Sequence, residues 1–172
     1  HDGSALVLHD QESRNFRVHL LRFANNESII EEGEMTSDCC AKGPSGIVMA
    51  SGRATVFGEE ELKKLAKESP CAQRMVAEGV QAYCSVPLLS HDRAMGAMNV
   101  GRLRASAFSP EDVDLLSQVG KQISIAVENA EAYRELAKLK DKLAKEKLYL
   151  EEEVRTEHNF GEIIGNCTAL RK

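Results

Sequence analysis

The chain has 172 residues, 42% of them hydrophobic, and a formal net charge of -5 at pH 7. This length suffices for one buried core, so we expect a single domain with an appendage. An acidic chain lacks the clustered positive field that phosphate backbones require, which argues against direct contact with nucleic acid. The apolar stretch Ala5–Leu8 is too short for a signal peptide or a spanning helix, so we expect a cytoplasmic protein without membrane contact.

The cysteines indicate a reducing environment. They are an odd number in a chain large enough to fold without disulfides, which predicts free thiols. No CxxC or HxxxH spacing occurs, so no metal site is predicted and no cofactor is identified. The adjacent Cys39 and Cys40 are expected to be loop residues. The full set is Cys39, Cys40, Cys71, Cys84 and Cys167.

The first part of the chain predicts a β-hairpin. Ser4–His9 and Phe16–Phe23 have the composition of strands, and the polar segment Asp10–Asn15 joins them. Neither strand is preceded by a helix, and the chain begins abruptly at His1, as if trimmed. The acidic segment Asn25–Pro44 is expected to be an exposed connection or a weak strand followed by a loop.

Between residues 43 and 79 the sequence predicts three short helices and one strand. The first helix is Gly43–Ser51, because Pro44 suits a first turn and Gly52 suits a C-terminal end. The strand Ala54–Phe57 follows. Two further helices lie before and after Pro70 and cover Glu59–Lys67 and Cys71–Glu78.

The segment Val80–Arg102 predicts a second hairpin. Two apolar runs flank the polar tetrad Ser90–Arg93, which is typical of two strands joined by a turn. The second strand carries the small residues Gly96, Ala97 and Gly101. Small residues allow close approach to the backbone, and we favour a packed helix there over a ligand.

A long helix follows with a clear start. Ser109 can cap it, Pro110 suits its first position, and Asp112 can reach back to the cap. Apolar residues at helical spacing then predict a stripe that packs on the sheet. These residues are Leu116, Val119, Ile123, Val127 and Ala130.

The helical pattern continues to about Arg155 with charged residues around a narrow apolar line. Leucines recur every seven residues, but the alternate core positions are Leu139, Glu146 and Glu153, so the heptad is imperfect. We expect a weak parallel two-stranded coiled coil, with a solvated linker helix as the alternative. The dimer residues would be Leu136, Leu139, Leu143, Leu150 and Val154.

The order of elements, with the motifs SVPLL, AMGAMNVGR and FSPEDVDLLSQVGKQIS, resembles a GAF domain from about Ser4 to Tyr133. The resemblance implies an α+β fold with a GAF-like antiparallel sheet of six or so strands in residues 1–133, and an N-terminal helix that is missing from this chain. It also implies helices on one face of the sheet and a ligand pocket under loops on the other.

The stretch EKLYLEEEVRTEHNFGEIIGNCTALRK is similar to the linker and first ATPase turn of sigma-54-dependent transcription activators of the formate-hydrogenlyase-activator type. Cys167 and Thr168 depart from the serine and proline that are common in that family. The similarity implies a coiled-coil linker at 134–158 and the start of an AAA+ ATPase domain at 159–172. The phosphate-binding GxxxxGK motif is absent, so we expect no enzyme activity from this chain.

These resemblances imply a sensor that binds a small molecule and controls the downstream ATPase as a homodimer. The pocket would lie between the sheet and the connection Gly33–Gly79, and Arg22 or Arg53 would be available to a small anion. The effector is not identified, and ordinary core packing is the alternative for each candidate. The lining candidates are Cys71, Met75, Tyr83, Cys84 and Met98.

Two other functions remain open from the sequence. One is a thiol-dependent enzyme resembling free methionine sulfoxide reductases, with Cys71 and Cys84 as its cysteine pair. The other is a purely structural dimerisation module. The ending IIGNCTALRK favours regulation over catalysis, because an independent enzyme does not need it.

Overall fold

The computed structural model describes residues 2–10, 15–23, 42–91, 93–104 and 108–157. The chain divides into two compact units, His1–Glu128 and Asn129–Lys172, and each is described by itself. The elements are β1 (Gly3–Asp10), β2 (Asn15–Phe23), α2 (Pro44–Ser51), β3 (Thr55–Gly58), α3 (Glu59–Leu65), α4 (Pro70–Ala77), β4 (Ala82–Ser90), β5 (Arg93–Arg102) and α5 (Pro110–Glu157).

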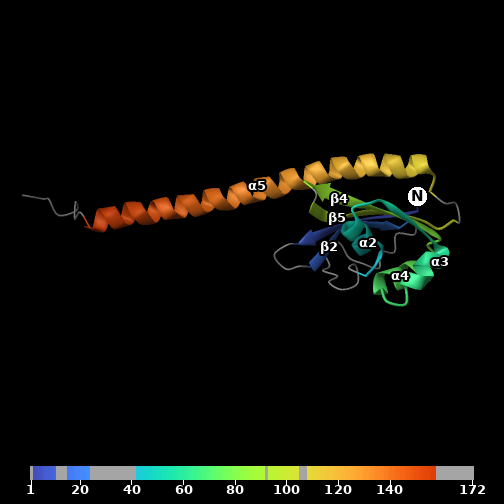
Figure 1. The fold of residues 1–172 in the computed structure, drawn as a ribbon. Helices are drawn as coiled ribbons and strands as arrows, with labels where there is room; N and C mark the ends of the chain where they lie inside the picture. Colours follow the sequence, from blue (N-terminus) through green and yellow to red (C-terminus); the bar gives the residue numbers. More distant parts are fainter. Residues whose placement is uncertain (1, 11–14, 24–41, 92, 105–107, 158–172) are drawn as a thin grey trace, which may run out of the picture. The chain divides into compact units, whose positions relative to one another are not determined.

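The first unit is built on an antiparallel sheet with the strand order β2-β1-β5-β4-β3 (Figure 1). Both expected hairpins are confirmed, since β1 pairs with β2 and β4 pairs with β5. The second turn is tighter than expected, because the strands continue to Ser90 and Arg93. The described residues form five strands, where the resemblance implied six or so.

Two of the short helices described in the first unit, α2 and α4, are followed by a glycine with a positive φ. Gly52 follows α2 with a φ of 66°, and Gly79 follows α4 with a φ of 78°. Residues that carry a side chain rarely adopt these left-handed backbone angles, so glycine is favoured at both positions. The helix ends expected from the sequence are confirmed here.

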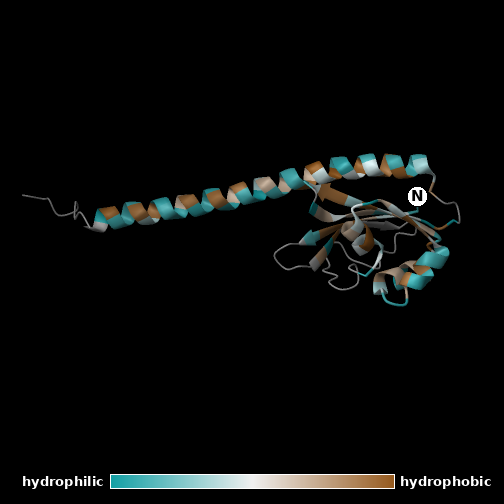
Figure 2. Cartoon of the chain, in the orientation of Figure 1, coloured by the Kyte–Doolittle hydropathy of each residue, from teal (hydrophilic) through white to brown (hydrophobic). Residues whose placement is uncertain are grey.

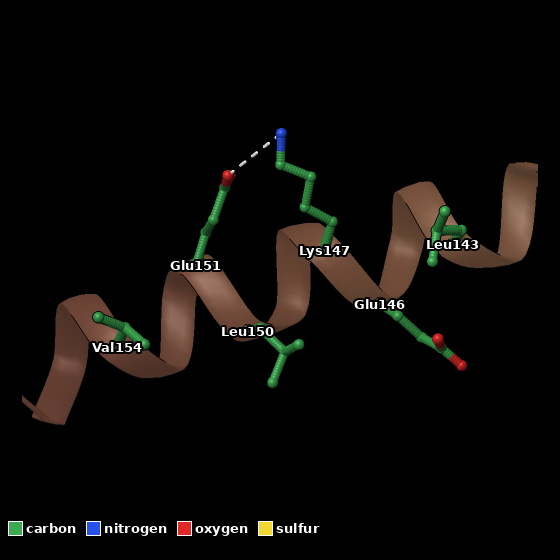
Figure 3. A pocket seen from close by; sticks show the side chains of 6 residues that line it. All are labelled: Leu143, Glu146, Lys147, Leu150, Glu151 and Val154. Atoms are coloured by element: carbon green, nitrogen blue, oxygen red, sulfur yellow. Dashed lines mark ion pairs between the residues drawn. The ribbon is translucent and has the colours of Figure 1, made fainter.

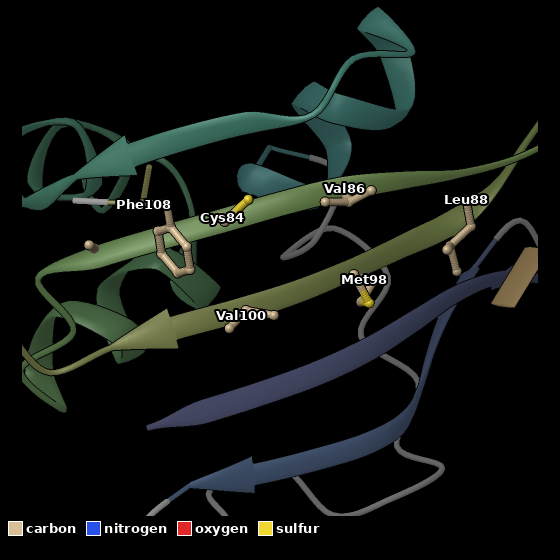
Figure 4. Packing of buried hydrophobic residues seen from close by; sticks show 7 residues of the cluster. Cys84, Val86, Leu88, Met98, Val100 and Phe108 are labelled. Atoms are coloured by element: carbon tan, nitrogen blue, oxygen red, sulfur yellow. The ribbon is translucent and has the colours of Figure 1, made fainter. Parts of the chain in front are cut away.

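The two central strands are buried on both faces. Cys84, Val86 and Leu88 of β4 lie with Met98, Val100 and Phe108 in one cluster (Figure 4). Val113, Leu116 and Ile123 of α5 pack against this cluster. Tyr83 and Ala97 belong to a second cluster with Val48 of α2. Because successive strand residues point to opposite faces, these are the two sides of one sheet. The expectation of helices on one face therefore needs correction: α5 packs on one face and α2 on the other.

The apolar strands lie inside the first unit, while brown and teal residues alternate along α5 (Figure 2). The stripe of α5 that faces the sheet differs from the predicted one, because Val119 is 41% exposed and Ala130 is exposed. Gly120 and Ser124 are buried instead. A Cβ on Gly120 would lie 2.9 Å from Val86 Cγ1, so these small residues let α5 approach β4 closely.

The start of α5 is capped as predicted and is tied to the end of β5. The Ser109 amide donates to Asp112 Oδ2 at 3.0 Å, and the Asp112 amide donates to Ser109 Oγ at 3.2 Å. Arg102 donates to the same Asp112 oxygen at 3.0 Å and lies 4.1 Å above the Phe108 ring. The backbone hydrogen bond from Ser109, followed by the bond from Arg102, lowers the pKa of the Asp112 carboxyl.

The packed helix expected beside the small residues of β5 is α2, whose Val48 shares a cluster with Ala97, but the two glycines contact other segments. A Cβ on Gly96 would collide with the Val7 carbonyl oxygen of the neighbouring strand β1. A Cβ on Gly101 would make ordinary contacts of 3.5 Å with Tyr83 and Val80. The close approach at Gly96 is between two strands, beside the irregularity in β1 between Leu6 and Val7. Helix α2 does contact β5.

Candidate functional site

One face of the sheet brings together three of the five candidate lining residues. Cys71 of α4 packs with Val7, Phe16 and Val18, and Met75 contacts this group. Met75 also contacts the neighbouring cluster that contains Tyr83. Cys71, Met75 and Tyr83 therefore lie on one continuous apolar surface between the sheet and the helix α4.

The other two candidates lie on the opposite face. Cys84 and Met98 belong to the cluster beneath α5 (Figure 4), so the five residues do not form one site. The reason is the two-residue period of a strand, which sends Tyr83 and Cys84 to opposite sides. Whether any of the five contacts an effector stays a prediction.

The environment of Cys84 is that of an inert core thiol. Its side chain is fully buried, and burial raises the pKa of the thiol to about 11, against a partial lowering by Arg102. A thiolate is the reactive form of cysteine, so Cys84 is unsuited to nucleophilic chemistry near neutral pH.

The cysteine pair required by the thiol-enzyme alternative does not form. Cys71 is disulfide-bonded, whereas Cys84 is free. The two residues lie in different clusters on opposite faces of the sheet. The expectation that all thiols are free was wrong for Cys71, because sequence spacing alone cannot reveal which cysteines meet in the fold.

Sequence reasoning missed a buried polar cluster on the face that carries Tyr83. Asn99 Oδ1 accepts hydrogen bonds from Ser85 Oγ at 2.6 Å and from Ser45 Oγ at 3.2 Å. The three side chains are 1%, 0% and 5% exposed, respectively. Asn99 Nδ2 donates to the Ala97 carbonyl oxygen at 3.5 Å. This cluster joins α2 to both central strands, and an asparagine inside an apolar strand was the available signal.

The second unit carries the exposed residues predicted for dimer contact. The leucine seam, as we name this set, is 55–67% exposed and comprises Leu136, Leu139, Leu143, Leu150 and Val154. A groove runs along part of it, lined by Leu143, Glu146, Lys147, Leu150, Glu151 and Val154 (Figure 3). Ion pairs join Lys142 to Glu146 at 3.8 Å and Lys147 to Glu151 at 3.6 Å.

Several predicted features lie outside the described residues, namely Cys39, Cys40, Cys167 and the segment 159–172. The side chain of Arg22 is also not described, and Arg53 is exposed. Within the ranges that the structure describes, no three histidine, cysteine or acidic side chains gather as a metal site would require.

No helix in the described part of the chain has both the length and the apolar character that crossing a bilayer requires.

A sequence model of the GAF domain matches residues 2–128. This chain belongs to the GAF domain family. The match agrees with the first compact unit, which ends at Glu128. The resemblance to GAF domains inferred from the sequence is thereby confirmed.

This GAF domain is also similar to transcription activators. Formate hydrogenlyase transcriptional activator FhlA of Escherichia coli strain K12 is 36% identical over 92 residues, 53% of this chain and 13% of that protein. The formate hydrogenlyase transcriptional activator of Salmonella typhimurium strain SL1344 is 35% identical over the same shares. The DNA-binding transcriptional activator HyfR of E. coli K12 is 27% identical over 104 residues, 60% of this chain and 16% of that protein. The chain thus matches a small part of each relative.

Solved GAF domains share the fold. The GAF domain of a Bacillus halodurans sensor histidine kinase gives a TM-score of 0.63 at 14% identity, over 77% of this chain and 84% of that one. The GAF domain of an Acinetobacter phosphoenolpyruvate-protein phosphotransferase gives 0.61 at 18% identity, over 76% and 74%. Identities this low show the fold alone.

Proposed function

We propose that this GAF domain senses a small molecule and controls a downstream AAA+ ATPase of a sigma-54-dependent activator through a dimeric helix. The observation that carries the proposal is α5, one helix that starts at a cap tied to the sheet and includes the whole leucine seam. The similarity to FhlA and HyfR supports the regulatory assignment. The sensory part would be residues 1–133, the linker 134–158, and the ATPase would begin at 159–172.

The effector would bind on the face that carries Cys71, Met75 and Tyr83. That face also contains the Ser45–Asn99–Ser85 cluster, which holds α2 against β4 and β5. β5 continues to Arg102, which bonds the cap of α5. A ligand that favours one arrangement of α2 and β5 would therefore act on the start of α5 through the backbone of β5 and the hydrogen bond from Arg102 to Asp112.

The proposed control needs no chemistry in this chain. A ligand shifts a two-state equilibrium by the difference between its affinities for the two states. Here the two states would be two arrangements of a helix pair, and the sheet unit would bind the effector better in one of them. The sign of control depends on which arrangement releases the ATPase.

A thermal-shift screen of small anions, nucleotides and other metabolites on this chain tests the proposal. A ligand present at 100 times its dissociation constant should add about 2.7 kcal/mol to the free energy of unfolding. Tyr83→Ala and Met75→Ala should abolish the shift in melting temperature. Met98→Ala, on the opposite face, should retain the shift, measured relative to the melting temperature of that variant without ligand. A stabilising ligand that also changes ATP hydrolysis by the full-length protein would support the whole proposal.

The opposite outcomes are equally definite. No stabilisation by any compound in a broad screen would favour the structural dimerisation module. Binding that leaves ATP hydrolysis by the full-length protein unchanged would separate sensing from control and contradict the second part.

A further inference from the structure

We infer that a second copy of this chain pairs with the leucine seam in parallel and in register, with Glu146 of each helix bonded to Lys147 of the other. This inference rests on the proposed dimer and specifies its contacts. It gives a function to Glu146, one of the two charged core positions, Glu146 and Glu153, that make the heptad imperfect.

The positions of the two residues follow from helix geometry. At about 100° of rotation per residue, Leu136, Leu143 and Leu150 stay within about 20° of one line along α5. Glu146 and Lys147 lie about 60° and about 40° to opposite sides of that line, with a rise of about 1.5 Å between them. They therefore flank the seam at one level, where the groove of Figure 3 contains both.

Each flank already carries an ion pair within the helix. Lys142 bonds Glu146 on one side, and Lys147 bonds Glu151 on the other. In a parallel pair with a two-fold axis along the helices, each flank faces the opposite flank of the second copy. Along one side of the pair the charges then alternate. Lys142 and Glu146 come from one copy, and they are followed by Lys147 and Glu151 of the second copy. The two-fold axis repeats this row on the other side.

Orientation and register both depend on this layer. In an antiparallel pair each flank faces the same flank of the second copy, so Glu146 faces the side that carries Glu146 and Glu153. A shift by one heptad would bring Glu146 opposite Lys140 and Glu153 opposite Lys147 on one flank only, and it would leave one leucine layer without its counterpart. A single polar layer in an apolar seam commonly selects register at some cost in stability. The layer therefore favours one geometry over its competitors.

The test uses Glu146→Lys and Lys147→Glu in the full chain. Each variant alone puts like charges at the layer, so its self-association should weaken at least about tenfold in sedimentation equilibrium. An equimolar mixture should restore association as heterodimers, because opposite charges then meet twice. The ion pairs within each helix are the same in homodimer and heterodimer, so the mixture isolates the contact between chains. Lys145→Glu makes the same charge change on the outer face and should associate like the native chain.

Orientation is measured independently with a photo-crosslinking residue at Leu150. The parallel arrangement predicts crosslinks to residues 146–154 of the second copy. Crosslinks only to residues before 143, or a mixture that associates no better than its components, would overturn the inference and leave dimerisation intact. A native chain that stays monomeric at high concentration would overturn the inference and the dimeric part of the proposed function together.

Discussion

The sheet unit and the second half of α5 differ in how their apolar residues are used. In the sheet unit, side chains such as Leu88 and Val48 are fully buried. From Asn129 to Arg155 every side chain of α5 is exposed, including the whole leucine seam. Leucine and valine side chains therefore stabilise the sheet unit by packing within the chain. In the second half of α5 the same side chains are exposed.

The two regions therefore differ in what can cover their apolar side chains. The sheet unit closes two apolar faces with its own helices α2 and α5. The second half of α5 has isolated ion pairs that are worth only tenths of a kcal/mol each. Helices are stabilised mainly by packing an apolar face, and the proposed dimer would supply that packing to this half. Four substitutions test this difference between the two regions.

The largest expected effect is in the sheet unit. Leu88→Ala removes a fully buried side chain from the cluster beneath α5 and should lower the free energy of unfolding by about 2–5 kcal/mol. Leu89→Ala is the matched control, because Leu89 itself is 39% exposed and its truncation should cost less than about 1 kcal/mol. Urea unfolding measures both. Equal losses would contradict the assignment of the buried face.

The next effect is on association. Leu143→Lys places two charges in the leucine seam and removes two leucines from it, so dimers should weaken at least about 100-fold. Far-UV circular dichroism and urea unfolding of the sheet unit should change little. Leu148→Lys, which is 60% exposed and lies about 140° away on the helix, should leave association unchanged in sedimentation velocity. Equal weakening by both variants would argue against the seam.

A smaller effect is expected from the polar cluster. Asn99→Ala leaves the Ser85 and Ser45 hydroxyls without their acceptor and should cost about 1–3 kcal/mol. Ser85→Ala should cost more than Ser45→Ala, because its bond is 2.6 Å rather than 3.2 Å long. A double-mutant cycle between Ser85 and Asn99 measures the coupling. Strictly additive losses would mean that the bond contributes no stability.

The smallest effect is the pH dependence of the α5 cap. The pKa of Asp112 is lowered from its ordinary value of 3.8, so the carboxylate stabilises the fold above that pH and loses its effect as pH falls through the lowered pKa. Asp112→Asn should therefore differ from the native chain at pH 7 and converge with it under acid. Urea midpoints at pH 7 and pH 3 measure this. A gap that widens in acid would contradict the cap. The pKa of Glu111 is also lowered, but Glu111 is present in both proteins, so its contribution to the pH dependence cancels in the comparison.

Local signals in the sequence were enough for the elements. Gly52 and Gly79 marked helix ends, Ser109 with Asp112 marked the start of α5, and the leucines spaced by seven marked the seam. These features depend on residues a few positions apart, so they can be read without the fold. The family also followed from motifs within single strands and helices.

The tertiary structure decided which faces meet. The sequence placed Cys84 and Met98 with Tyr83, but their strand positions send them to opposite sides of the sheet. The sequence also placed Val119 against the sheet. In the structure the small residues Gly120 and Ser124 are buried against the sheet instead, and Val119 is exposed. The Ser45–Asn99 bond joins residues 54 positions apart. Periodicity determines which residues share a face, and packing between distant segments determines what each face contacts.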